Sequence, residues 1–194
     1  MLSTIENSLT ATCGLFEVMV KDVQFLDNIE EIAKIWLAAL RNDKKIIFAG
    51  NGGSAADSQH LAAEMISRFC FDRKPLPALS LTVDTSAITA ISNDYGYESV
   101  FSRQLEALGN VGDVLVVIST SGQSPNVLKA LTVARELGLV CVGFTGNRKN
   151  AMNELCDYLV EIPHNDTARI QEGHIACGHA ICEYVEASYF KEGG

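Results

Sequence analysis

The distribution of apolar residues divides the chain into a helical first part and an alternating second part. Between residues 2 and 41, apolar positions such as Leu9, Phe16 and Val20 recur at near-helical spacing, and no proline interrupts them. We expect two helices here, with Asn28 as the cap of the second. After this region, short apolar runs alternate with stretches of helical character, which is the pattern of a repeating strand–helix unit.

Five apolar runs are the expected strands. They are residues 45–49, 79–83, 113–119, 140–145 and 158–162. Runs that are apolar on both faces and separated by helices indicate a parallel sheet covered on both sides. A last helix is expected from about Thr167 to Tyr189. The predicted fold is therefore α/β, a doubly wound five-stranded parallel sheet with an N-terminal helical hairpin. We expect one domain over residues 1–194, with helices over 1–41 and the α/β core and C-terminal helix over 42–194.

The overall composition narrows the class of protein without naming an activity. Fifteen Lys and Arg against 24 Asp and Glu give a net charge of −9, which disfavours direct nucleic-acid binding because that requires many cations. A local anion site remains possible. No run reaches the roughly 18 apolar residues of a membrane helix, and no export signal is apparent. Six dispersed cysteines without a Cys-x-x-Cys pair indicate reduced, mostly buried thiols and a cytoplasmic protein.

A hydroxyl-rich loop follows the strongest predicted strand. Its four hydroxyls belong to Ser119, Thr120, Ser121 and Ser124. Ligands of doubly wound sheets bind beyond the carboxyl ends of the strands, and a helix N-terminus attracts anions. Pro125 fits the first turn of the following helix, with Ser124 as its N-cap. No Gly-Lys-Ser/Thr follows, which disfavours hydrolysis of a nucleoside triphosphate. The loop therefore predicts a phosphate monoester site, in preference to a helix that is merely capped.

A glycine-rich loop and the helix after it carry the second candidate group. Gly50-Asn51-Gly52-Gly53-Ser54 follows the first strand and lacks the full Gly-x-Gly-x-x-Gly spacing, so a small-molecule pocket is favoured over dinucleotide binding. A helix from Ser54 to Phe69 places His60 and Glu64 on one face, where they could share a divalent ion. A surface hydrogen bond is the commoner explanation of such a pair taken alone.

The last predicted helix adds Gln171, His174 and His179. Gln171 and His179 are eight residues apart, about 12 Å along the helix axis and roughly 80° around it. Either the two side chains lean toward one ion, or they serve sites on different subunits. His174 lies elsewhere on the helix and is not an expected ligand, and His164 is expected to be a loop residue.

Four motifs together resemble the sugar isomerase (SIS) domain family and, within it, the phosphoheptose isomerases. They are residues 50–60, Asn93-Asp94-Tyr95-Gly96, residues 119–126 and residues 167–172, in order over nearly the whole chain. The resemblance implies an aldose–ketose isomerase that converts sedoheptulose 7-phosphate to D-glycero-D-manno-heptose 7-phosphate, through an enediol, for the heptoses of bacterial lipopolysaccharide or other surface polysaccharide. It also implies a cytoplasmic homotetramer with active sites at subunit contacts.

The resemblance further implies roles for individual residues. The implied Zn²⁺ ligands are His60, Glu64, Gln171 and His179. The implied phosphate contacts are Ser119, Thr120, Ser121 and Ser124. The remaining substrate contacts would be Asn51, Gly52, Gly53, Ser54, Asn93 and Asp94, with His60, Glu64 and Gln171 also facing the sugar. Isomerisation needs a base and an acid, and we expect Glu64 as the base and His179 as its acid–base partner. The sequence leaves open which of the two is the principal base.

Two alternative functions remain open. One is a non-catalytic SIS protein that binds the replication initiator or senses a sugar phosphate, a branch that lacks residues corresponding to Glu64 and His179. The other is a SIS enzyme for amino or pentose sugar phosphates, which often lacks the Gln171 and His179 pair. Ala168 stands where some isomerases carry an acidic residue, with Asp166 nearby, and this departure bears on substrate positioning.

Overall fold

The computed structural model describes residues 2–191, so residues 1 and 192–194 of the predicted domain lie outside the described part. The helices are α1 Leu2–Lys21, α2 Val23–Arg41, α3 Gly53–Ile66, α4 Thr85–Tyr95, α5 Val100–Leu108, α6 Pro125–Glu136, α7 Met152–Leu155 and α8 Thr167–Lys191, with a 3-10 turn η1 at Tyr97–Ser99. The strands are β1 Ile46–Gly50, β2 Ala78–Ser80, β3 Val114–Ile118, β4 Val140–Gly146 and β5 Tyr158–Ile162.

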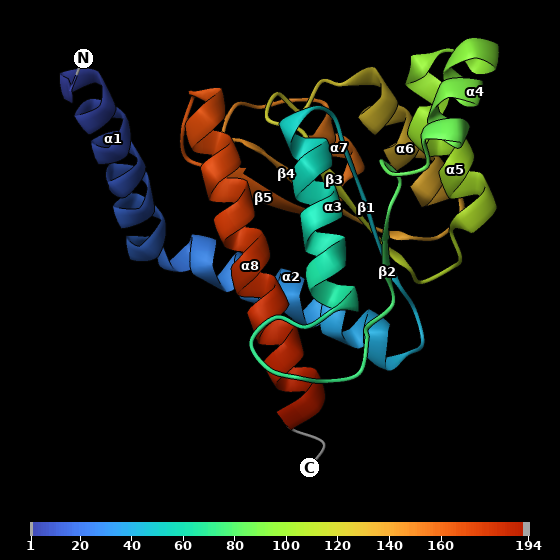
Figure 1. Cartoon of the computed structure of the whole chain (residues 1–194), viewed down its shortest axis with the longest axis horizontal. Helices are drawn as coiled ribbons and strands as arrows, with labels where there is room; N and C mark the ends of the chain where they lie inside the picture. Colours follow the sequence, from blue (N-terminus) through green and yellow to red (C-terminus); the bar gives the residue numbers. More distant parts are fainter. Residues whose placement is uncertain (1, 192–194) are drawn as a thin grey trace.

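The five strands form one parallel sheet in the order β2-β1-β3-β4-β5 (Figure 1). This is a doubly wound order, in which β2 is added on one side of β1 and β3 to β5 are added on the other. The pairing of Ile46 with Val114 and of Gly50 with Ile118 brings the ends of β1 and β3 to the same edge. The predicted fold class is confirmed, and the loops after β1 and β3 meet at this switch point.

Alternation of side chains along the strands supplies the two cores. In β1, Ile46 and Phe48 join the core beneath α2, α3 and α8, while Ile47 and Ala49 join the core beneath α5 and α6. Successive strand residues point to opposite faces, so a strand buried on both faces must be apolar throughout. Trp36 of α2 packs edge-on against Phe48, with ring centroids 5.3 Å apart.

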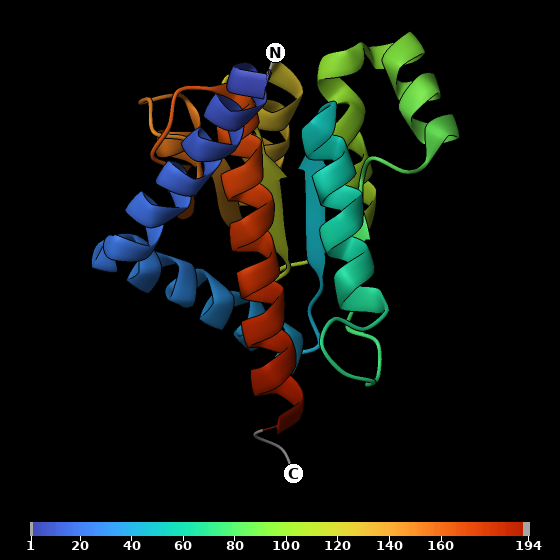
Figure 2. The same ribbon diagram turned by 60° about the vertical axis from the view of Figure 1, so that its left-hand side comes forward.

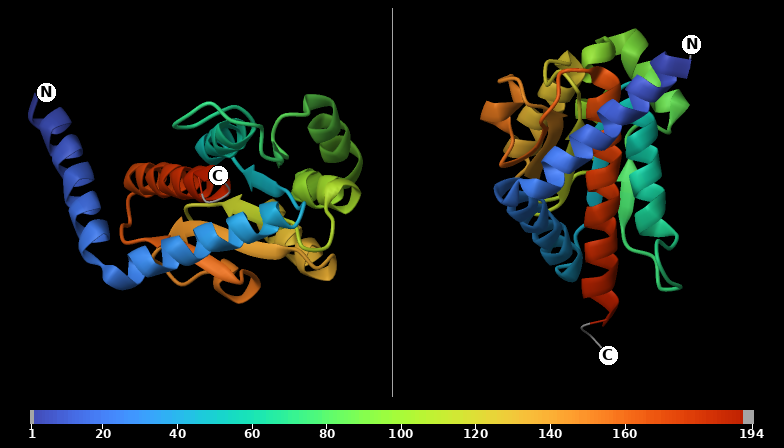
Figure 3. Two further views of the ribbon diagram at one scale, coloured as in Figure 1. Left: turned by 90° about the horizontal axis from the view of Figure 1, so that it is seen from below. Right: turned by 90° about the vertical axis from the view of Figure 1, so that its left-hand side faces the viewer.

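The predicted hairpin is present as two helices, but its cap differs from the expectation. Asp22, in extended conformation, accepts a hydrogen bond from the backbone N–H of Phe25 at 3.0 Å and is the N-cap of α2. The predicted cap Asn28 lies inside α2 and donates to the carbonyl of Leu159 at 2.6 Å, which ties the helix to β5. Figure 3 shows α1 leaving α2 at a wide corner, with α1 beside the start of α8.

Two predicted boundaries also move. The strand expected over 79–83 is shorter and lies at Ala78–Ser80 as β2; Leu81 still donates to the carbonyl of Phe48 at 2.9 Å, and Asp84 then caps the start of α4. The helix expected from Ser54 to Phe69 ends at Ile66. The chain from Ser67 to Pro77 then forms a loop that passes the last turns of α8 and runs back to β2, as Figure 1 shows.

The expected burial of the cysteines is confirmed for some of them and not for others. Cys141, Cys177 and Cys182 are buried and Cys156 is half-buried, whereas Cys13 and Cys70 are exposed, so "mostly buried" holds for four of the six. Burial raises the pKa of the Cys177 thiol to about 12, which keeps it protonated and unreactive. Within residues 2–191, no helix combines the length and apolar character needed to cross a membrane.

His174 is a buried polar residue in the middle of α8. Its Nε2 lies 3.1 Å from the carbonyl oxygen of Thr145 and donates to it, while its buried Nδ1 has no partner among the described residues. A second proton on Nδ1 would have no acceptor. Burial accordingly lowers the pKa of His174 to about 4, although the hydrogen bond to Thr145 opposes the shift.

This histidine should make stability depend on pH. Between pH 6.5, the ordinary pKa of histidine, and about pH 4, His174 is protonated in the unfolded chain but stays neutral in the folded one. The free energy of unfolding therefore falls as the pH drops through this range. The loss over that window should be about 3 kcal/mol. We expect His174→Gln to flatten this slope, measured as the free energy of unfolding in urea at pH 7, 6, 5 and 4.5. An unchanged slope in the variant would refute the assignment.

Candidate active site

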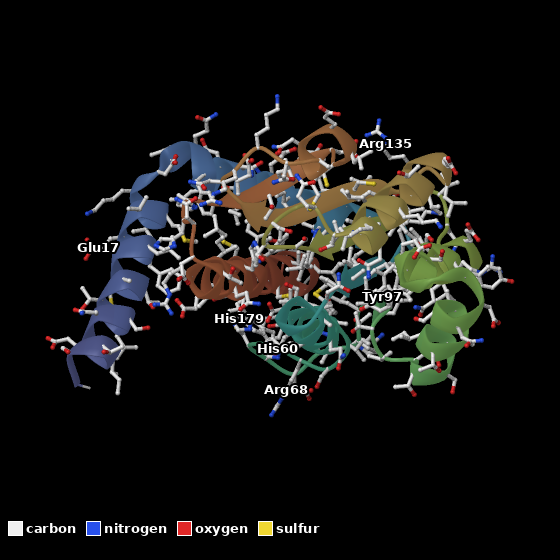
Figure 4. All side chains as sticks on the ribbon, turned by 90° about the horizontal axis from the view of Figure 1, so that it is seen from above. Glu17, His60, Arg68, Tyr97, Arg135 and His179 are labelled. Carbon is white, nitrogen blue, oxygen red and sulfur yellow. The ribbon has the colours of Figure 1, made fainter. Side chains whose placement is uncertain are left out.

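Helices α3 and α8 lie side by side and run in the same direction, as Figures 1 and 2 both show. Gly178 permits their close approach, because a Cβ there would lie 2.7 Å from Cδ2 of Leu61. The contact brings His60 of α3 opposite His179 of α8, although the two residues are 119 positions apart. Figure 4 shows the two labelled histidines next to each other between these helices.

His60, Glu64 and His179 form one cluster. Nε2 of His60 lies 2.8 Å from Nε2 of His179 and 3.3 Å from Oε1 of Glu64, and one ligand atom from each of the three lies within 4.8 Å of the others. The His60 side chain is 47% exposed and that of Glu64 22%, so the cluster faces an accessible surface. The ring of Phe69 packs on His179, with centroids 5.5 Å apart.

The donor set of the cluster fits a divalent metal ion. Two imidazoles and a carboxylate are the ligands of many catalytic zinc sites, which keep a fourth position open. Ligand atoms around a tetrahedral zinc are separated by about 3.3 Å. The 3.3 Å between His60 and Glu64 matches this, and the 2.8 Å between the histidines is slightly shorter. The site can therefore hold such an ion with small side-chain movements.

Gln171, the fourth expected ligand, lies at the other end of α3. Its Nε2 would be 2.6 Å from a Cβ placed on Gly53, so the side chain rests against the first residue of the helix. Gly53 precedes His60 by seven residues, which is about 10 Å along the axis. The structure thus brings together three of the four expected ligands within one chain, and the role of Gln171 stays a prediction.

Asp57 is a neighbour of the cluster that the sequence analysis did not single out. It is half-buried on α3, one turn before His60. Burial raises the pKa of its carboxyl, while the charges of His60 and His179 act in the opposite direction. The i, i+3 spacing to His60 could have revealed it. Asp57 adds negative potential beside a site whose donors already favour a cation.

The hydroxyl-rich loop lies between β3 and α6, as expected. Ser124 is the N-cap residue of α6 and Pro125 its first residue, but the Ser124 hydroxyl faces Oγ of Ser119 at 3.2 Å and does not cap the backbone. Gly122 has a φ of +63°, and a Cβ there would lie 2.1 Å from Asn150. Only glycine fits this turn. The hydroxyls on either side of it are grouped at the N-terminus of α6, where an anion is favoured.

The other half of this loop opens onto a cavity of about 340 Å³ at the carboxyl ends of the central strands. Thr120 and Ser121 line it together with residues that the sequence analysis did not select, which are Gln123, Gly146, Arg148, Lys149, His164, Asn165, Thr167 and Ile170. Arg148 donates to the side chain of Asn165 at 2.9 Å. Two cations beside two hydroxyls suit an anion, although the chain as a whole is acidic.

Asn51 has a partner that the sequence did not reveal. The side-chain amides of Asn51 and Asn126 exchange two hydrogen bonds of 2.9 Å, and the hydroxyl of Tyr97 donates to Oδ1 of Asn51 at 2.9 Å. Asn126 is 2% exposed. This network fixes the glycine-rich loop against the start of α6 and so sets the two loops relative to each other. Gly52 is exposed at this turn and Ser54 is buried beneath it.

Asn93 and Asp94 form no side-chain hydrogen bond with either loop in the described part of the chain. They are exposed on α4, where the amide of Asn93 donates to Asp94 at 2.8 Å, and α4 buries none of its residues. Arg68 is exposed after α3, and Figure 4 shows it pointing away from the histidines. The substrate contact expected for Asn93 and Asp94 stays a prediction.

Comparison with known proteins agrees with this fold. A family model described as "SIS domain" matches residues 17–146, from the last turns of α1 to the end of β4. The match covers more than half of the chain and includes both loops and the helix that carries His60 and Glu64. The fold is that of a SIS domain.

Relatives at higher similarity narrow the family. Phosphoheptose isomerase of Burkholderia pseudomallei (strain 1710b) is 52% identical over 97% of this chain and 96% of its own. That of Aneurinibacillus thermoaerophilus is 49% identical, over 96% and 94%. The structure of phosphoheptose isomerase from Neisseria gonorrhoeae superposes with a TM-score of 0.88 at 41% identity, covering 96% of this chain and 98% of that one. The chain belongs to the SIS domain family and, within it, to the phosphoheptose isomerases, as the motifs predicted.

Proposed function

We propose that this protein is an aldose–ketose isomerase that converts sedoheptulose 7-phosphate to D-glycero-D-manno-heptose 7-phosphate, for the biosynthesis of bacterial surface heptoses. The observation that carries the proposal is the convergence of His60, Glu64 and His179 on one accessible point. A non-catalytic SIS scaffold has no need of a base, an acid and a metal site in one place. The named relatives, at up to 52% identity over nearly the full length, support the same activity.

The reaction moves a carbonyl from C2 to C1 through an enediol. A base must remove a proton from C1 and the same proton, or another, must return to C2. Glu64 would take and return this proton, and the partial exposure of its carboxylate supports this role. His179 would exchange a proton with the sugar oxygens, and the contacts of its ring with His60 and Phe69 support a fixed orientation.

We propose Zn²⁺ as the cofactor, held by His60, Glu64 and His179. When bound, such an ion supplies a Lewis acid for the oxygens of C1 and C2. Gln171 would complete the ligand set from a neighbouring subunit, since within the chain its side chain lies against Gly53. Asp57 would keep the neighbouring imidazoles oriented and the local potential negative.

The phosphate of the substrate would bind the hydroxyls of Ser119, Thr120, Ser121 and Ser124 at the start of α6. The side chains of Arg148 and Lys149 line the same cavity as Thr120 and Ser121 and supply positive charge. Asn51, Gly52, Gly53 and Ser54 would line the path from the phosphate to the cluster. Together these groups can hold an anionic sugar on an acidic protein.

We further propose a cytoplasmic homotetramer in which subunits complete each other's sites. Two observations support shared sites. Asn93 and Asp94 lie on a helix with no buried residue, and Gln171 is separated from the other expected ligands. The whole chain would act as one SIS domain within each subunit.

The direct test is incubation with sedoheptulose 7-phosphate while aldose formation is followed by NMR. Steady conversion to the aldose is the expected result. Absence of turnover in metal-loaded protein, together with tight binding of the sugar phosphate, would instead favour the non-catalytic alternative. Turnover of a pentose or amino sugar phosphate alone would favour the other branch of the family.

Ser124→Ala should mainly raise KM. One hydroxyl bonded to a phosphate contributes about 1.5–3 kcal/mol, which corresponds to an increase in KM of about 10-fold or more. Because the contact is present in both ground and transition states, kcat should change by less than about 3-fold. Steady-state kinetics measures both. Thr132→Ala, which removes an exposed hydroxyl two turns along α6, is the matched control and should change neither. A large fall in kcat at unchanged KM would contradict phosphate binding by Ser124.

A further inference from the structure

An ion pair lies two helical turns beyond the cluster, at the end where α3 gives way to the loop Ser67–Pro77. Arg73 of this loop pairs with Glu186 of α8, with Nε and Oε1 2.8 Å apart, and the two side chains are 2% and 1% exposed. Glu186 follows His179 by seven residues, so the two lie on nearly the same face of α8, about 10 Å apart along the axis.

The guanidinium of Arg73 caps the end of α3. It donates to the carbonyls of Glu64 at 2.8 Å, Met65 at 2.7 Å and Ser67 at 3.1 Å. The last carbonyls of a helix have no partner within the helix, and a cation there is favoured by the helix dipole. One of these carbonyls belongs to Glu64 itself, so the cap holds the backbone of a cluster residue.

The carboxylate of Glu186 fixes the loop that follows. It accepts hydrogen bonds from the backbone N–H groups of Phe69 at 2.8 Å and Cys70 at 2.6 Å. Burial alone would raise the pKa of Glu186, but these donors and Arg73 hold it below its ordinary value, so the group stays ionised. Phe69 is also the residue whose ring packs on His179.

The contacts of the pair with the carbonyl of Glu64 and the N–H of Phe69 thus connect it to the cluster from two sides. Arg73 holds the helix that carries His60 and Glu64, whereas Glu186 belongs to the helix that carries His179. A buried ion pair is a weak source of stability compared with apolar residues of the same volume. The planar guanidinium, in contrast, donates from Nε to Glu186 and from its other nitrogens to carbonyls at the end of α3, and so fixes the distance and orientation of the two helices well.

We infer that Arg73 and Glu186 are positioning residues that set the separation of α3 and α8 at the active site, and through it the geometry of His60, Glu64 and His179. The inference rests on the proposed role of this cluster. A displacement of about 1 Å at a reacting group can lower the rate about 100-fold. Residues that orient metal ligands commonly change metal affinity about 10- to 100-fold.

The chain offers a matched control at the amino ends of β1 and β3, where the contacts of the buried acid hold neither α3 nor α8. Asp113 is also 1% exposed, accepts from the backbone N–H groups of Lys45 at 3.0 Å and Asn110 at 2.8 Å, and pairs with the ammonium of Lys45. It lies just before β3, away from the carboxyl ends of the strands. Glu186→Gln and Asp113→Asn therefore remove the same kind of charge, with the same kind of partners, from two different places.

The experiment compares wild type, Glu186→Gln, Arg73→Lys and Asp113→Asn as full-length protein. Affinity for Co²⁺ is measured by competition with a chelator, together with the visible spectrum of bound Co²⁺, kcat and KM, and the melting temperature. We expect Glu186→Gln and Arg73→Lys to bind Co²⁺ about 10-fold or more weakly, with an altered spectrum and a kcat lowered about 10-fold or more at nearly constant KM. Asp113→Asn should lose melting temperature only.

The possible outcomes distinguish a failure of the positioning role of Arg73 and Glu186 from a failure of the proposed metal site. Wild-type affinity, spectrum and kcat in Glu186→Gln or Arg73→Lys would overturn the positioning role, as would an equal loss of Co²⁺ affinity in Asp113→Asn. If Glu186→Gln does not fold, Arg73→Lys, which keeps the charge and part of the cap, decides the question. A wild-type chain that binds no Co²⁺ at all would contradict the proposed metal site itself.

Discussion

Glu64→Gln is expected to lower kcat by at least about 100-fold while the protein stays folded and binds the sugar phosphate normally. The amide has nearly the shape of the carboxylate and keeps an oxygen that a metal ion can bind. It cannot accept the proton from C1, so the loss should appear in kcat and in the exchange of that proton with D₂O. Steady-state kinetics and NMR in D₂O measure the two effects.

Two further measurements separate the role of Glu64 as a base from its role as a metal ligand. Metal content of the variant, measured by elemental analysis, shows whether the ion is retained. Glu183→Gln, an exposed change on α8, is the control and should leave turnover unaltered. Near-normal turnover in a metal-loaded Glu64→Gln variant would eliminate Glu64 as the base and leave His179 as the candidate.

Removal of the metal ion should have an effect of similar size. Chelation is expected to reduce turnover by at least about 100-fold, and addition of Zn²⁺ should restore it, because the oxygens that develop charge in the enediol lose their Lewis acid. The chelated protein should still bind the sugar phosphate, since the hydroxyls around Ser124 are on the loop after β3. Elemental analysis of protein purified without chelator identifies the resident ion.

The variant His60→Ala, which removes one of the three clustered ligands, tests whether the added Zn²⁺ acts at this site. Added Zn²⁺ should fail to restore this variant at concentrations that restore the chelated wild type. Full activity after complete removal of metal, verified by elemental analysis, would show that the reaction needs only the side chains of the cluster.

Apolar runs predicted the sheet well because strands buried on both faces must be apolar throughout. The reaction class and family followed from four motifs, two of which follow β1 and β3 and two of which lie on or at the end of α4 and at the start of α8, and both are confirmed. The N-cap of α2 was harder to predict. Asn28 and Asp22 are equally good cap residues, and the choice depends on Asn28 finding the carbonyl of Leu159, a contact 131 residues away.

The site shows the same division between local and distant information. The i, i+4 spacing of His60 and Glu64 could be read from the chain, and the structure adds His179 to the pair. The separation of Gln171 from the cluster depends on the alignment of α3 with α8, which no local spacing determines. Arg73 and Glu186 gave no signal, since an arginine in a loop and a glutamate in a helix are ordinary surface residues until their burial is known.

The junction of α3 and α8 has a consequence for how the protein is made. The two histidines are 119 residues apart, and α8 is the last element of the described chain to be synthesised. A ligand that needs both histidines can bind only after the whole sheet between them has formed. Such binding would stabilise the finished fold and no earlier intermediate. A ligand bound at this site would therefore be found only on completely folded chains, and not on partly folded ones.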